Sequence, residues 1–163
     1  MKKHLPLIVI LVLGTALHFV YDLTGKNSFI GLFCPVSESV WEHFKLVLFP
    51  MIGFFVYNGI EKGYFSPVAL FVSVVHSALI MFGIFYFYTA GLGMESSVVI
   101  DIPSYFVNVI VTYFMFLSLS ERSYPMYLSV LAAALTALFV IYVWKVTYNP
   151  PPLPIFTDFS KKG

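Results

Sequence analysis

Apolar residues run almost without interruption along five long stretches of the chain, and short polar segments separate them. The stretches are residues 5–23, 40–60, 67–89, 102–120 and 124–146. Each is close to the ~20 residues that an α-helix needs to cross a bilayer. None alternates polar and apolar residues as the strands of a membrane barrel do. The pattern predicts an all-α, polytopic transmembrane bundle of five spans in a single domain over residues 1–163, with a Pro-rich tail at 147–163.

Residues typical of helix N-termini stand at the beginnings of several of these stretches. Ser39 and Glu42 are three residues apart, which is the spacing of a capping box. Ser66 and Asp101 each stand shortly before a proline, a pattern typical of an N-cap followed by Pro in the first turn. Pro50 lies inside the second stretch and predicts a kink there.

Composition narrows the class of protein. The chain is 60% apolar and 10% charged, with a mean hydropathy of +0.90 and a net charge of +1. These values exclude a soluble domain and a disordered chain, and they give no basic field for a nucleic acid. The single cysteine, Cys34, excludes an intrachain disulfide. The expected partner is the lipid bilayer. Five helices enclose little volume, which favours a homodimer, and the sequence indicates no other protein partner.

Basic residues give the expected orientation. With the N-terminus inside, the inner side holds Lys2, Lys3, Lys62 and Arg122, and the outer side holds Lys26, Lys161 and Lys162. The positive-inside rule therefore predicts a multi-pass protein of a cell membrane, with a cytoplasmic N-terminus and an external C-terminus. A cleaved signal peptide is the alternative for the first stretch, but the apolar run continues well past the small residues at Gly14.

Polar residues within the spans carry the functional prediction, because ionisable groups are costly in lipid. His18 and Asp22 are four residues apart and share one helix face. Glu42 and Lys45 lie three residues apart on the second span, with His43 beside them. The five-span topology places these groups toward the same, outer side of the bundle.

Histidine nitrogens and carboxylate oxygens are typical zinc ligands, and a catalytic zinc keeps three protein ligands and one open position. The predicted metal ligands are His18, His43 and His76, and the predicted catalytic carboxylates are Glu42 and Asp22. The predicted polar lining is Glu38, Lys45, Asp101 and Asn108. A divalent metal such as zinc would activate water against a membrane-borne substrate, which makes a metal-dependent hydrolase the leading hypothesis.

Two other functions fit the same residues. Histidine titrates near neutral pH, so the cluster also suits a proton-coupled or small-solute transporter or channel. In a non-catalytic assembly or scaffold protein the polar groups would be structural. On that interpretation Glu42 and Asp101 cap helices, Lys45 forms an ion pair, and Asn108 bonds between helices.

The first loop and the tail are both unusually apolar. Residues 27–36 include Phe29 and Phe33, so we expect this loop to lie at the membrane interface. The tail has four prolines within residues 150–154, and Leu153, Ile155 and Phe156 would anchor it across the outer surface. Asp158 would then reach the polar cluster, so that loop and tail together form a lid.

The chain resembles a small uncharacterised family of prokaryotic integral-membrane proteins. The resemblance rests on His18–Tyr21, on Glu38–Lys45 with Pro50, and on the late Pro-Pro-Leu-Pro-Ile-Phe. It covers most of the chain and implies a prokaryotic cytoplasmic membrane, but it implies no activity, because the family is a domain of unknown function. Membrane metal hydrolases of the ceramidase and adiponectin-receptor kind are only an analogy, because this chain has fewer helices and lacks their paired-histidine motif.

Overall fold

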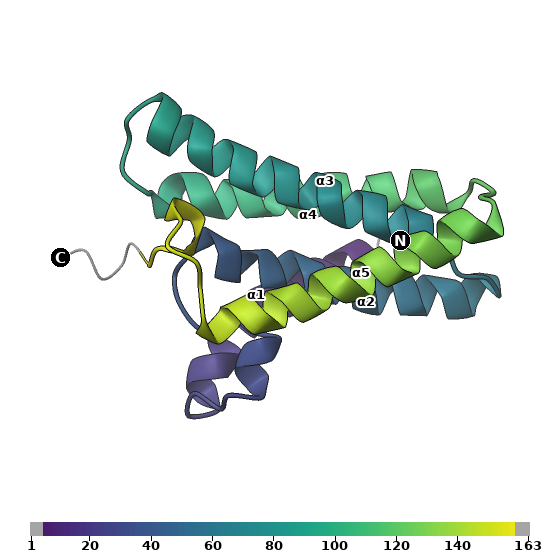
Figure 1. The fold of residues 1–163 in the computed structure, drawn as a ribbon, viewed down its shortest axis with the longest axis horizontal. Helices are drawn as coiled ribbons and strands as arrows, with labels where there is room; N and C mark the ends of the chain where they lie inside the picture. The colour runs from purple at the N-terminus through teal and green to yellow at the C-terminus, as the bar shows by residue number, and fades with distance from the viewer. Residues whose placement is uncertain (1–4, 159–163) are drawn as a thin grey trace.

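Five long helices form the protein in a computed structural model, which describes residues 5–158 (Figure 1). They are α1 (Leu5–Leu23), α2 (Val40–Lys62), α3 (Pro67–Tyr86), α4 (Val98–Ser120) and α5 (Met126–Tyr148). Three short turns accompany them: η2 (Ile30–Leu32), η3 (Phe87–Gly91), which continues α3 as a π-helix, and η4 (Pro154–Phe156). All five long helices are long and apolar enough to cross a membrane. The predicted all-helical, single-domain bundle of five spans is confirmed.

Helix α2 supplies most of the core. Phe44, Leu48 and Met51 on this helix are almost completely buried. By contrast, α1 buries only Ile10 and Gly14 and leaves its other side chains partly or largely exposed. Exposed leucine and valine are unfavourable in water and favourable in hydrocarbon. The bundle therefore has α2 at its centre and an apolar outer surface that suits lipid.

The helices run back and forth between two ends of the bundle (Figure 1). At one end α1 finishes, α2 begins and the η4 segment lies; we call this the tail end. At the other end, called the opposite end, the short connections from α2 to α3 and from α4 to α5 lie side by side (Figure 1). Gly63 closes α2 there in the left-handed conformation that glycine adopts readily.

Of two predicted helix caps, the structure confirms one and corrects the other. Ser39 caps α2 as expected, because its hydroxyl accepts a hydrogen bond from the Glu42 N–H at 3.3 Å. Asp101, predicted as an N-cap, instead lies in the first turn of α4, which begins at Val98. Its carboxylate accepts hydrogen bonds from the Tyr88 hydroxyl (2.7 Å) and the Ser96 hydroxyl (3.3 Å). That prediction was wrong because the acid bonds to the end of α3 and to the preceding turn, contacts that local spacing does not reveal.

The first loop and the tail both pack on the tail end. The Tyr148 hydroxyl donates to the Ser28 carbonyl at 2.6 Å, joining α5 to the loop. The Phe156 ring lies 4.7 Å, centroid to centroid, from the Trp41 indole on α2. Phe156 therefore anchors the tail as predicted, whereas Leu153, another predicted anchor, is exposed. Both segments lie beside the start of α2.

Candidate functional site

Two histidines and one glutamate converge at the tail end from three segments of the chain. His18 lies on the last turns of α1, Glu38 in the loop before α2, and His43 on the first turn of α2. One ligand atom from each residue lies within 4.8 Å of the other two. We call these three residues the His/Glu cluster. Across residues 5–158 it is the one group of three or more His, Cys, Asp or Glu side chains arranged closely enough to hold a metal ion.

Glu38 joins the two histidines with its two oxygens. Its Oε2 lies 3.3 Å from His43 Nε2, and its Oε1 lies 3.9 Å from His18 Nε2. The two imidazole rings are stacked, with centroids 5.1 Å apart and an interplanar angle of 27°. The Nε2 atoms of both histidines therefore face the same carboxylate.

A backbone contact orients His43. Its Nδ1 lies 2.9 Å from the Ser39 carbonyl oxygen, one turn earlier on α2. A carbonyl only accepts, so Nδ1 carries a proton and donates it. Nε2 donates to the Glu38 carboxylate when the ring is protonated, and in the neutral ring it has a lone pair that can bind a cation. Metal-binding histidines commonly donate their second ring N–H in this way, and the bond fixes the tautomer and the ring orientation.

The cluster is partly open to solvent. The Glu38 side chain is 52% exposed, and the two histidine side chains are 29% and 27% exposed. The hydrogen bond with His43 lowers the pKa of the Glu38 carboxyl, because it stabilises the charged form. Asp158 in the tail acts electrostatically on Glu38 and opposes this lowering of the pKa. Glu38 is therefore ionised at neutral pH and accessible from outside the bundle.

A buried ion pair supports the loop that carries Glu38. Lys45 Nζ donates to Glu42 Oε2 at 2.7 Å and to the Gly31 carbonyl at 2.8 Å, and its side chain is completely buried. Glu42 Oε2 also accepts the Val36 N–H at 3.0 Å. The pair thus bonds to backbone at both ends of the segment 31–36. It fixes the loop against α2 two residues before Glu38.

The remaining predicted site residues lie in other surroundings. Asp22 is exposed one turn beyond His18 and acts on it electrostatically. Asn108 donates to the Ser77 carbonyl at 3.2 Å, between α4 and α3. His76 lies on α3, and its buried Nδ1 has no hydrogen-bond partner in the described structure.

The predicted residues therefore do not share one buried pocket. His18 and His43 lie together as expected. The third residue beside them is Glu38, whereas His76 was the predicted third metal ligand. Asp101 bonds to Tyr88, and Glu42 to Lys45. Glu38 stands outside the helices, in a loop whose path the sequence pattern does not define. The one feature of the sequence that could have identified Glu38 as a metal ligand is its position five residues before His43.

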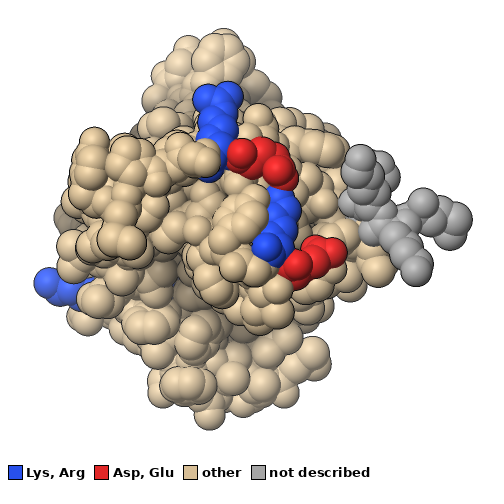
Figure 2. All heavy atoms as spheres, turned by 90° about the vertical axis from the view of Figure 1, so that its right-hand side faces the viewer, with Lys and Arg blue, Asp and Glu red and all other residues tan. Residues whose placement is uncertain are grey.

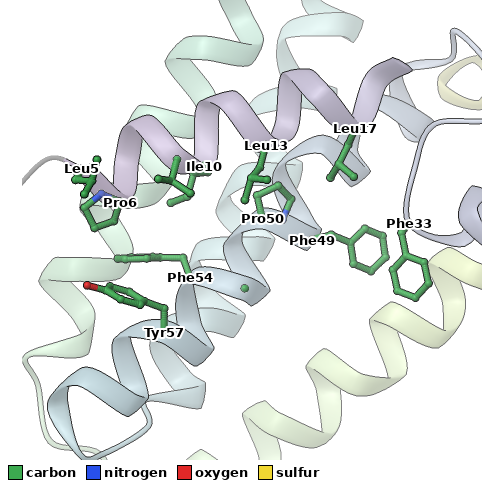
Figure 3. A pocket seen from close by; sticks show the side chains of 12 residues that line it. Leu5, Pro6, Ile10, Leu13, Leu17, Phe33, Phe49, Pro50, Phe54 and Tyr57 are labelled. Atoms are coloured by element: carbon green, nitrogen blue, oxygen red, sulfur yellow. The ribbon is translucent and has the colours of Figure 1, made fainter. Parts of the chain in front are cut away.

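An apolar groove of about 610 Å³ runs along α1 and α2 (Figure 3). On the α1 side Ile10, Leu13 and Leu17 point across it toward Pro50 and Phe54 of α2 (Figure 3). Its lining residues are Leu5, Pro6, Val9, Ile10, Leu13, Leu17, Phe33, Phe49, Pro50, Gly53, Phe54 and Tyr57. The groove lies within the two membrane spans. The groove reaches Leu17, the residue before His18, so the part of the groove nearest the tail end lies at the level of the His/Glu cluster.

Comparisons with known proteins place the chain in a family but give no activity. A family model described as "Family of unknown function (DUF6512)" matches residues 2–162, almost the whole chain. No curated protein and no solved structure matches the chain. The uncharacterised family expected from the sequence is confirmed, and its prokaryotic source stays a prediction.

Proposed function

The chain belongs to the DUF6512 family of unknown function and has the five apolar helices of a multi-pass membrane protein, and from its site we propose that it binds a divalent metal such as zinc. The ligands are His18, Glu38 and His43. The observation that carries the proposal is the convergence of their three ligand atoms within 4.8 Å, from three separate segments. Two imidazoles and one carboxylate are a known ligand set of catalytic zinc.

The exposure of the cluster supports a catalytic rather than a structural metal. Structural zinc is closed by four protein ligands, whereas this group offers three side chains and faces solvent over half of Glu38. A metal with an open position lowers the pKa of a bound water and supplies a hydroxide nucleophile near neutral pH. We therefore infer hydrolysis as the class of reaction.

Of the two predicted catalytic carboxylates, Asp22 is the better placed to accept a proton. It is exposed, lies one helical turn from His18 and has no hydrogen bond or ion pair to another described side chain. Glu42 is buried and already accepts hydrogen bonds from Lys45 and Val36. In this proposal Asp22 is the general base, and Glu42 positions the loop.

The groove indicates that the substrate carries a hydrocarbon chain. It extends along α1 from Leu5 to Leu17, which is ~18 Å at a rise of ~1.5 Å per residue. Its lining is almost entirely apolar, and it lies inside the spans, where only hydrocarbon surrounds the protein. A chain seated there would bring its polar head to the level of His18.

Zinc binding by the purified protein tests the metal proposal. Wild-type protein in detergent should contain zinc by elemental analysis. His43→Ala and Glu38→Gln should each weaken zinc binding by about 100-fold or more, measured in competition with a chromophoric chelator, because each removes a direct ligand.

His76→Ala is the matched control, because it removes a histidine that lies outside the cluster. It should bind zinc as the wild type does. Wild-type protein without bound zinc, or a His43→Ala variant with unchanged affinity, would contradict the proposal. A loss of zinc in His76→Ala would show that His76 is a ligand, as predicted from the sequence.

Filling the groove tests the substrate class. A Cβ added at Gly53 meets no atom within 4 Å, so the side chain of Gly53→Trp enters the groove without displacing backbone. We expect the yield of photo-crosslinking to a phospholipid with a diazirine in its acyl chain to be several-fold lower for this variant than for the wild type. Gly83→Trp on α3 is the control, since its added Cβ also meets open space, away from the groove. Equal labelling of the two variants at the groove residues would contradict this assignment.

A further inference from the structure

The apolar groove lies mostly in the half of the membrane spans that is farther from the His/Glu cluster. Gly14 is the middle residue of α1, and all the α1 residues that line the groove precede it except Leu17. Met51 is the middle residue of α2, and the lining residues of this helix run from Phe49 to Tyr57. Both helices therefore place the groove across the middle of the spans and toward the opposite end.

The groove begins beside the cluster, because the same two segments contribute to both. Leu17 lines the groove, and the next residue, His18, belongs to the cluster. Phe33 lines the groove from the first loop, with its ring centroid 5.1 Å from that of Phe49 on α2. The same loop, held against α2 by the buried ion pair, continues to Glu38. A molecule in the groove thus has a direct path to the cluster.

Aromatic and aliphatic side chains border the far end of the groove. Figure 3 shows the rings of Phe54 and Tyr57 beside Leu5 and Pro6, at the end of the groove away from Phe33. The two rings are stacked, with centroids 6.3 Å apart and an interplanar angle of 26°. These surfaces suit the end of a hydrocarbon chain.

The far end of the groove offers no charged side chain to a lipid headgroup. None of the described residues that line the groove is charged. Figure 2 shows the opposite end of the bundle, where basic and acidic side chains lie close together on a mostly uncharged face. Lys62 and Glu121 there form an ion pair with each other. A lipid in the groove therefore finds charged and metal-binding groups at the His/Glu cluster, which places its head at the tail end.

The distance from the cluster to the far end of the groove exceeds the depth of one leaflet. His43 and Tyr57 are fourteen residues apart on α2, which is ~21 Å at a rise of ~1.5 Å per residue. The hydrocarbon core of a bilayer is ~30 Å thick, so each leaflet contributes ~15 Å. A chain that starts at the cluster and fills the groove therefore crosses the middle of the membrane.

We propose that the substrate is a lipid with one long hydrocarbon chain that crosses the membrane midplane, as a polyisoprenoid chain does. The inference rests on the proposed function, which places the polar head of the substrate at the His/Glu cluster. From there the chain passes Leu17 and Phe33 and follows the groove to Tyr57. The groove thereby selects its substrate by the length of the chain.

The test uses the full chain, loaded with zinc in lipid nanodiscs, and two photo-crosslinking probes. Both probes have a monophosphate head and a diazirine at the end of the chain, and the chain is either geranylgeranyl or geranyl, which is half as long. Mass spectrometry of peptides locates the labelled residues. We expect the geranylgeranyl probe to label residues around Leu5 and Tyr57, and the geranyl probe to label residues around Leu17 and Phe49.

Gly53→Trp separates the two halves of the groove. Gly53 lies two residues beyond the middle of α2, and an added Cβ meets no atom within 4 Å. The variant should lower labelling around Tyr57 by the geranylgeranyl probe several-fold and leave labelling by the geranyl probe as in the wild type. Gly83→Trp, whose added Cβ also meets open space away from the groove, is the matched control and should change neither.

A third variant tests the position of the head. His43→Ala removes a metal ligand and should lower labelling of the groove by both probes. Labelling that this variant leaves unchanged would show that the head is not held at the cluster. If wild-type protein binds zinc but both probes label Tyr57 equally, or the longer probe labels only residues around Leu17, the inference about chain length is wrong and the metal proposal stands. Protein without zinc instead contradicts the metal proposal itself.

Discussion

Lys45→Met should lower the free energy of unfolding by about 3–5 kcal/mol, because it leaves Glu42 as a buried, unpaired carboxylate. The Gly31 and Cys34 carbonyls also lose the ammonium donor. Thermal unfolding in detergent measures the effect, and a loss of this size corresponds to about 10 °C for a chain of this length. Because the ion pair holds the segment 31–36 in front of Glu38, zinc binding should weaken as well.

Two companion variants separate the ion pair from a general effect of charge. Lys62→Met breaks an exposed pair with Glu121 and should cost less than about 1 kcal/mol. The double variant Glu42→Leu, Lys45→Met removes both buried charges together and should recover much of the stability lost by Lys45→Met. A Lys45→Met protein that melts like Lys62→Met would show that the buried pair contributes no more than a surface pair.

Gly14→Ala should destabilise the protein by about 1–3 kcal/mol, because α1 and α2 are in backbone contact at this residue. An added Cβ would lie 2.5 Å from the Leu46 carbonyl oxygen and would collide with the Tyr105 hydroxyl. Pro50 explains why the chain comes so close there. It has no N–H to donate to Leu46, four residues earlier, so this carbonyl is free to face α1.

The Gly14 substitution should also weaken the metal site. His18 lies one turn after Gly14, and its ring stacks on His43 of α2, so moving the two helices apart separates the two imidazoles. Zinc affinity and melting temperature should therefore fall together. Gly83→Ala provides the comparison, since its added Cβ meets open space and alanine favours a helix. Equal melting temperatures for the two alanine variants would mean that α1 and α2 are not in close contact.

Span length and apolar composition determined the architecture from the sequence alone. A backbone in lipid must satisfy its hydrogen bonds internally, so five apolar stretches of this length allow only five helices. The alternating direction of those helices then brings the end of α1 to the start of α2. This is why His18 and His43 could be expected at the same end of the bundle, and the structure places them there.

Only the tertiary structure decided which polar groups meet. Glu38 becomes the third member of the cluster because Lys45 and Glu42 hold the preceding loop, and those bonds join residues up to fourteen positions apart. Asp101 accepts a hydrogen bond from Tyr88, and His76 lies outside the cluster. Side-chain packing fixes the rotation of each helix about its own axis, and this rotation decides which neighbour a residue meets. Helical periodicity gives the face on which a residue lies, whereas the neighbour that this face meets depends on contacts between distant parts of the chain.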